Sequence, residues 1–243
     1  MIIENPFNTA IVIPAYKETD TIVQLINGIF KSLPQCYILI VDDSPSDEIS
    51  SLIKSLNYSN VEVIWRKKKE GRGSAVLQGF KTLVSNNQFS CFVEMDADSS
   101  HRPEELPALL NHFHSNKLDL LIGSRYLKES KIVNWPIQRR IFSRLANYLA
   151  RFLLQIPISD YTNGYRIYSK RSIEEIIKNA DRDLKGFILL SDILVLLNKR
   201  NFKIGEFPTV FINRVRGESS VNLKEIIDSF NGLMRIWKKS KSF

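Results

Sequence analysis

The chain has few cysteines and histidines and no long apolar run. It therefore lacks the residues on which disulfide-linked proteins, cysteine–histidine metal sites and membrane-spanning helices depend. Its 243 residues include two cysteines and three histidines. Cys36 and Cys91 lie in apolar runs, and no histidine stands at ligand spacing from either, so both are expected to be small core residues. No apolar run approaches the ~20 residues that a spanning helix requires. The opening MIIENPFNTA lacks the basic start and apolar stretch of a secretory signal, so a cytoplasmic location is expected.

Positive charge exceeds negative charge, with 34 Lys and Arg against 26 Asp and Glu, a net charge of +8. Such a balance attracts nucleic acid, anionic lipid or phosphorylated substrates. No helix-turn-helix, zinc-finger or aromatic-stacking pattern accompanies the charge, so a nucleic-acid partner is not expected. Seven basic residues and one acidic residue fall between Arg125 and Arg151, which concentrates the charge in one segment.

Apolar runs of strand length alternate with helical patterns through the first half of the chain. The expected strands cover 10–13, 37–41, 61–65, 89–95 and 118–122, and the expected helices cover 19–32, 46–56, 72–86 and 103–116. This order predicts an α/β fold with a Rossmann-like, mostly parallel sheet flanked by helices. The second half is less regular, with amphipathic helices expected at about 136–155 and 222–239.

The most informative motif is Asp96-Ala97-Asp98, directly after the apolar run FSCFVEM. Carboxylates at the carboxyl end of a sheet strand lie where open α/β sheets bind ligands. While strand geometry lasts, Asp96 and Asp98 would point to the same side. Such a pair suits Mg²⁺ carried by substrate phosphates, although Asp98 and Ser99 could instead cap the following helix.

Three other expected strands also end in polar or special residues: Pro14-Ala15-Tyr16-Lys17-Glu18, Asp42-Asp43-Ser44 and Gly71-Arg72-Gly73-Ser74. The carboxyl ends of parallel strands meet at one edge of the sheet. The sequence therefore predicts one crevice lined by acids, a tyrosine and glycines.

The ordered motifs PAYKE, VDDSPSD, GRGSAVLQGF, EMDADSSHRPEEL, GSRY, DYTNGYRIYSK and RVRGESSVN resemble the family 2 inverting glycosyltransferases of the GT-A fold. Within that family the chain is most similar to the polyprenol-phosphate mannosyl- and glucosyltransferases, the dolichol-phosphate mannose synthase type. The resemblance covers about residues 9–220. Residues 1–220 would form the catalytic domain, and 221–243 a basic amphipathic helix that contacts a membrane or a partner.

The resemblance implies roles for matching positions. A nucleotide-sugar pocket would be formed by Pro14, Ala15, Tyr16, Glu18, Asp42, Asp43, Gly73, Asp96 and Ala97. Mg²⁺ or Mn²⁺ would bind Asp96 and Asp98 and bridge to the donor diphosphate. Arg125 and Arg214 would act near the transferred sugar and the acceptor phosphate, with Arg139 and Arg140 as further phosphate-binding candidates.

The chain departs from the family pattern in three places. Ser99-Ser100-His101 replaces Leu-Gln-His, so Ser100 or a water would serve as the third metal ligand. Gly217-Glu218-Ser219-Ser220 lacks the lysine of Gly-x-Ser-Lys. Asp192 stands where the family usually has Glu.

The implied reaction moves a hexose from a donor of the GDP-mannose or UDP-glucose type to a polyprenyl phosphate, with inversion. The acceptor oxygen is already anionic, so it needs cationic positioning rather than a general base. A sugar hydroxyl acceptor is the main alternative, with Asp160 as the first candidate base. A distant alternative is a receiver domain in which Asp96 accepts a phosphoryl group. Receiver domains begin with the acidic pair, whereas here an expected strand and helix at about 10–32 precede Asp42 and Asp43, which argues against this alternative.

The second half supplies a candidate lid and a candidate membrane face. The loop-like stretch 125–138 could close over the donor. In the helix after it, Arg140, Arg144 and Arg151 form a stripe beside an apolar face of Ile141, Leu145, Tyr148, Leu149 and Phe152. The last helix, with Asn222 as its expected cap, repeats the pattern and ends in three lysines. These helices either pack on the core or dock on a membrane surface or an integral membrane partner, giving a peripheral location at the cytoplasmic face.

Overall fold

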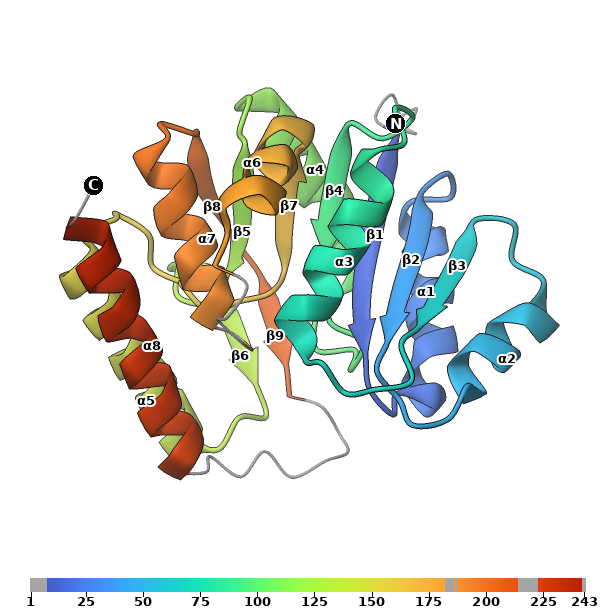
Figure 1. Ribbon diagram of the computed structural model, residues 1–243, viewed down its shortest axis with the longest axis horizontal. Coiled ribbons are helices and arrows are strands. Elements are labelled where there is room, and N and C mark those ends of the chain that lie inside the picture. Colours follow the sequence, from blue (N-terminus) through green and yellow to red (C-terminus); the bar gives the residue numbers. More distant parts are fainter. Residues whose placement is uncertain (1–7, 182–185, 187, 214–222, 242–243) are drawn as a thin grey trace.

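The computed structural model describes residues 8–181, 186, 188–213 and 223–241. It is built around one seven-stranded sheet (Figure 1). The strand order is β3-β2-β1-β4-β7-β5-β8. Strand β7 runs antiparallel to its neighbours β4 and β5, and the other pairs are parallel. The strands are β1 (Thr9–Ala15), β2 (Tyr37–Asp42), β3 (Val61–Trp65), β4 (Cys91–Glu94), β5 (Leu120–Ser124), β7 (Arg166–Ser169) and β8 (Ile204–Pro208). The prediction of a mostly parallel α/β sheet is confirmed.

Helices cover both faces of this sheet. They are α1 (Thr19–Ser32), α2 (Glu48–Leu56), α3 (Arg72–Val84), α4 (Leu106–Ser115), α5 (Ile137–Leu154), α6 (Lys170–Asn179), α7 (Ile188–Lys199) and α8 (Leu223–Lys241). One core contains buried residues of α3, α6 and α7, and the other contains those of α1, α2 and α4. Strand β1 serves both, because Ala10 and Val12 face the first core while Ile11 and Ile13 face the second. Strands buried on both faces explain the unbroken apolar runs of the sequence.

Helix α3 lies unusually close to the sheet. A Cβ atom on Gly79 would stand 2.5 Å from Cγ1 of Val12, so only glycine allows this approach. The close packing brings the first residue of α3, Arg72, to the carboxyl ends of the central strands.

Two details of the second half differ from expectation. The stretch 125–138 is not all loop, because β6 (Lys131–Val133) pairs in parallel with β9 (Val210–Ile212) in a separate sheet. The sequence pattern also missed β7, α6 and α7. Helix α8 packs beside α7 and α5, and its Leu233 and Ile236 belong to the first core. The expected cap Asn222 and the site residue Arg214 lie outside the described residues.

Within the described part of the chain, no helix is both long and apolar enough to cross a membrane. Cys91 begins β4 and Cys36 directly precedes β2. Both are buried and neither forms a disulfide, as the sequence predicts.

Candidate active site

The ends of β1 and β4 meet beside the start of α1. Pro14 and Ala15 close β1, and Tyr16 follows with 36% of its surface exposed. The Lys69 ammonium lies 4.0 Å from the centre of the Tyr16 ring. The Thr21 hydroxyl donates to the carbonyl of Ala97 (3.0 Å), which joins α1 to the acidic motif. Glu18, at the cap position of α1, accepts a hydrogen bond from the same hydroxyl (3.2 Å).

The two acids after β2 have different surroundings. Asp43 accepts from Nε of Arg66 (2.5 Å) and from the backbone N–H groups of Glu70 (3.0 Å) and Gly71 (2.8 Å). This carboxylate therefore fixes the loop that leads into α3. Asp42 accepts from the N–H and hydroxyl of Ser44 through Oδ1, while its buried Oδ2 has no hydrogen-bond partner among the described residues. Burial raises the pKa of Asp42. The place of Asp42 and Asp43 in the nucleotide-sugar pocket stays a prediction, and Asp42 has an unused oxygen for such a contact.

Gly73, an expected pocket residue, has a packing role. A Cβ atom at this position would lie 2.8 Å from Cδ2 of Leu189 on α7. Glycine therefore allows α3 and α7 to approach each other next to the crevice.

Arg72 joins two acids at the end of β4. Its Nη1 donates to Oε1 of buried Glu94 (2.6 Å), and its Nε donates to Oδ1 of Asp96 (2.8 Å). The hydroxyl of Tyr168 donates to the other Glu94 oxygen (2.8 Å). Burial alone would raise the pKa of Asp96, but the positive charge of Arg72 and its hydrogen bonds outweigh burial and hold that pKa below its ordinary value. Asp96 is therefore a carboxylate at neutral pH.

His101 fixes the backbone of the acidic motif. Its Nδ1 accepts the N–H of Asp96 (3.1 Å), so in the neutral ring Nε2 carries the proton and donates to Oδ1 of Asn163 (3.0 Å). The ring stacks on Tyr165, with centroids 4.9 Å apart. No role was predicted from the sequence for His101, which matches the family pattern, or for Asn163, which lies within the motif DYTNGYRIYSK.

Asp98 and Ser100 lie in a turn rather than on the strand, because β4 ends at Glu94. Oδ1 of Asp98 accepts the N–H of Ser100 (3.0 Å). The Ser100 hydroxyl is buried and has no hydrogen-bond partner in the described part of the chain. The two carboxylates are thus oriented by this turn and by Arg72, not by strand alternation as the sequence predicted.

This donor set fits a hard divalent cation. Two carboxylates and an unpaired hydroxyl oxygen suit Mg²⁺ or Mn²⁺, which complete their coordination with substrate phosphates and water. Across the described residues, no group of three or more His, Cys, Asp or Glu side chains could hold a metal by itself. A cation here would therefore need ligands from a bound substrate.

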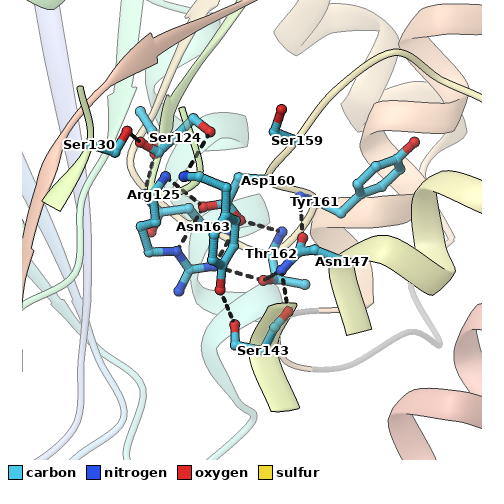
Figure 2. Close-up of polar contacts among 12 residues, drawn as sticks. Ser124, Arg125, Ser130, Ser143, Asn147, Ser159, Asp160, Tyr161, Thr162 and Asn163 are labelled. Atoms are coloured by element: carbon cyan, nitrogen blue, oxygen red, sulfur yellow. Dashed lines mark hydrogen bonds and ion pairs between the residues drawn. The ribbon is translucent and has the colours of Figure 1, made fainter. Parts of the chain in front are cut away.

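Arg125 and Asp160 form a buried ion pair next to the acidic motif (Figure 2). Nε of Arg125 donates to Oδ2 of Asp160 (2.7 Å) and Nη2 to Oδ1 (2.8 Å), while Nη2 also donates to the hydroxyl of Thr162 (2.8 Å). The backbone N–H groups of Arg125, Thr162 and Asn163 bind the same carboxylate. Burial would raise the pKa of Asp160, but the Arg125 charge and these hydrogen bonds lower it. Such a carboxylate is a poor general base, which argues against the role that a hydroxyl acceptor would give it.

Aromatic rings surround the Arg125 guanidinium. Its central carbon lies 5.4 Å from the ring centres of both Trp135 and Phe211. Arg139 stacks on the same Trp135 at 4.3 Å and donates to Oδ1 of Asn213 (2.9 Å). Nη1 of Arg125 makes no hydrogen bond to the described residues, so its donors remain available to an anion.

Arg140 lies next to this cluster, and its Nη2 donates to the carbonyl of Ile132 (2.9 Å). Two of the three expected phosphate-binding arginines in this region therefore lie together, because Arg125 and Arg139 both contact the Trp135 ring. Arg140 instead binds the backbone of β6. Phe211 connects the two halves of the site, because its ring contacts both Arg125 and His101.

The fold and site define a glycosyltransferase of the GT-A type, and the chain belongs to glycosyl transferase family 2, whose model matches residues 10–177. It is 36% identical over 217 residues to a polyprenol monophosphomannose synthase of Mycolicibacterium smegmatis, covering 88% of this chain and 81% of that protein. It is 32% identical to an undecaprenyl-phosphate mannosyltransferase of Micrococcus luteus, covering 87% and 86%. A dolichol-phosphate mannosyltransferase of Pyrococcus furiosus is also 32% identical, covering 94% of this chain but 63% of that protein.

Among solved structures, the chain is similar to glucosyl-3-phosphoglycerate synthase of Mycobacterium tuberculosis in complex with Mn²⁺, UDP and glucosyl-3-phosphoglycerate. The TM-score is 0.67 at 16% identity, covering 97% of this chain and 80% of that one. At this identity the likeness shows the fold. The resemblance to family 2 seen in the sequence is confirmed.

Proposed function

We propose that this enzyme transfers a hexose from a GDP-mannose- or UDP-glucose-type donor to a polyprenyl phosphate, with divalent-cation dependence and inversion. The observation that carries the proposal is the juxtaposition of a carboxylate pair and an arginine cluster. Residues 160–163 connect them, because Asn163 accepts from His101 while Asp160 binds Arg125. The names of the three sequence relatives support the lipid-phosphate acceptor.

On the donor side, the departing diphosphate accumulates negative charge. Mg²⁺ or Mn²⁺ held by Asp96, Asp98 and Ser100 would offset that charge as a Lewis acid. Arg72 keeps Asp96 ionised, and His101 holds its backbone N–H, so the carboxylate is fixed in position before the donor arrives. Such preorganisation spares the site a rearrangement during the reaction.

On the acceptor side, a phosphate monoester needs positioning rather than deprotonation. Nη1 of Arg125 has unused donors, and the planar guanidinium suits forked contacts to phosphate oxygens. Arg139, which stacks on the same Trp135, adds a second cation. Arg214 follows Asn213 by one residue and is proposed to join them. Attack by the phosphate oxygen opposite the leaving diphosphate would invert the anomeric carbon.

The test combines a donor panel with an acceptor comparison. Purified enzyme with Mg²⁺ or Mn²⁺ is given radiolabelled GDP- and UDP-sugars, with polyprenyl phosphate or with the unphosphorylated polyprenol in detergent. We expect label in the organic phase with the phosphate alone, at a rate that varies little between pH 7 and 9. Transfer to the alcohol, with a rate that rises through a titrating base, would overturn the acceptor assignment.

Helix α5 is proposed to hold the enzyme on the membrane surface that contains the acceptor. Ile137, Tyr148 and Phe152 are 73%, 72% and 69% exposed, and Ile141, Phe142 and Leu145 are each more than half exposed. All of α5 is described, and its buried residues are Asn147 and Ala150. Packing on the core therefore does not explain this apolar face. With the exposed Arg144 and Arg151 it matches an anionic bilayer, commonly found at a cytoplasmic face.

A vesicle experiment tests the α5 proposal. Wild-type enzyme is expected to sediment with phosphatidylcholine vesicles that contain phosphatidylserine, and less with phosphatidylcholine alone. The double variant Y148S/F152S should bind about thirtyfold more weakly, because each ring contributes on the order of 1 kcal/mol of partial burial. L56S, at a 42% exposed leucine of α2, is the matched control and should bind like wild type. Equal binding by both variants would reject α5 as the docking surface and favour an integral membrane partner.

A further inference from the structure

Arg72 stands between two acids and the turn that contains Gly164. Its guanidinium makes two contacts to Oδ1 of Asp96, at 2.8 Å from Nε and 2.7 Å from Nη2, and a third to Glu94. A Cβ atom on Gly164 would lie 1.9 Å from Nη2, so this position must lack a side chain for Arg72 to remain there. The guanidinium is thus closely packed, with 15% of the side chain exposed.

The N-terminus of a helix is an unfavourable place for a cation, so the position of Arg72 must be explained by its two acidic partners. Arg72 is the first residue of α3, where the helix dipole repels positive charge, and the first turn of α3 has no acidic residue. Its two carboxylate partners come from β4 and the loop after it. Arg72 therefore orients the acidic residues at the end of β4 and does not stabilise the helix that it begins.

The contacts limit what Asp96 can offer to a metal. Oδ1 already accepts the guanidinium, which leaves Oδ2 as the oxygen available to a cation. Asp98 likewise has Oδ1 in use by the N–H of Ser100. A divalent cation at this pair would also lie close to the fixed positive charge of Arg72, which opposes its binding. A donor diphosphate would bring negative charge and oxygen ligands that outweigh this repulsion.

We propose that Arg72 is a positioning residue that suppresses divalent-cation binding by the acidic motif until the nucleotide is present. The inference rests on the proposed function, because it takes Asp96 and Asp98 as the cation's protein ligands. The enzyme would then take up its cation together with the donor. Arg72 would hold the Asp96 carboxylate in place in the meantime.

Manganese binding followed by electron paramagnetic resonance tests this without turnover. Wild-type enzyme is titrated with Mn²⁺ alone and with Mn²⁺ in the presence of GDP or UDP. We expect at least tenfold tighter Mn²⁺ binding with one of the nucleotides. In Arg72→Gln, Mn²⁺ alone should bind about tenfold more tightly than to wild type, because the opposing charge is gone. Arg72→Lys keeps the charge and should retain the weak binding of wild type.

The outcomes separate the two levels of the proposal. Equal Mn²⁺ affinity of wild type with and without nucleotide overturns the role of Arg72 while leaving the cation site intact. Unchanged or weaker Mn²⁺ binding in Arg72→Gln, with an unchanged melting curve, overturns it as well. If wild type binds no Mn²⁺ under any condition, the metal assignment of the proposed function fails, and the inference fails with it. Should Arg72→Gln not fold, Arg72→Met is titrated in its place with the same expectation, and equal Mn²⁺ affinity of wild type with and without nucleotide would still overturn the proposal.

Discussion

Replacing Asp98 by alanine is expected to lower hexosyl transfer at least a thousandfold while the fold persists. A metal contributes several kcal/mol of transition-state stabilisation, and each 1.36 kcal/mol is a factor of ten in rate. The described hydrogen bond of the Asp98 side chain is to the N–H of Ser100 in a partly exposed turn. Losing it should cost only about 0.5–1.5 kcal/mol of stability.

The measurement is kcat/KM at saturating Mn²⁺, paired with a thermal melt. Glu174→Ala is the matched control, because this exposed carboxylate lies on α6. Helix α6 follows the carboxyl end of the antiparallel strand β7, at the opposite edge of the sheet from the site. Glu174→Ala should retain wild-type activity. Turnover by Asp98→Ala within tenfold of wild type would remove Asp98 from the metal site.

Replacing Arg125 by alanine is expected to damage both stability and transfer. It leaves the fully buried Asp160 carboxylate without its cation, and breaking a buried pair in this way costs about 3–5 kcal/mol. For a domain of this size, each kcal/mol lowers Tm by roughly 2–4 °C. Loss of the guanidinium beside the acidic motif should also lower kcat about a hundredfold or more, as the removal of one transition-state donor typically does.

Two comparisons separate these effects. Arg171→Ala removes an exposed partner of Asp119 and should cost under about 1 kcal/mol, with activity unchanged. Arg125→Lys keeps a positive charge near Asp160 but loses the paired hydrogen bonds of the guanidinium. We therefore expect a large fall in kcat and a small loss of stability. An Arg125→Lys enzyme with wild-type kcat would show that the arginine is structural.

The pair also has a defined pH dependence. The pKa of Asp160 is lowered in the fold, so the pair stabilises the protein above the ordinary aspartate pKa of about 3.9. That contribution is lost as pH falls through the lowered folded pKa. Stability measured between pH 2 and 5 should therefore decline more steeply for wild type than for the double variant R125M/D160L.

The first half of the fold followed from the sequence because its strands, apart from the edge strand β3, are buried on both faces. Such strands appear as unbroken apolar runs, separated by helices with a clear apolar stripe. Strand β7 was not predicted from the sequence, because it is four residues long and lies antiparallel between β4 and β5. The β6–β9 pair escaped because strands of three residues have too few positions for alternation to be visible.

The acidic motif was predictable for a similar reason: polar residues at the end of a buried strand stand out. Its supporting contacts were not. Arg72 is separated from Asp96 by 24 positions and Asn163 from His101 by 62, and no local pattern relates such residues. The place of Asp43 in the nucleotide pocket stays a prediction. Its hydrogen bonds to the loop before α3 could not be predicted, because they depend on backbone N–H groups and leave no mark in the sequence.

The most direct test of the central claim is a mass spectrum of the lipid after reaction. Wild-type enzyme, Mn²⁺, undecaprenyl phosphate and GDP-mannose or UDP-glucose are incubated together, and the lipid is extracted. The account predicts a phospholipid heavier by one hexosyl residue, formed by wild type and absent with Asp98→Ala. Unmodified lipid, while the same enzyme attaches hexose to a sugar hydroxyl, would contradict the account.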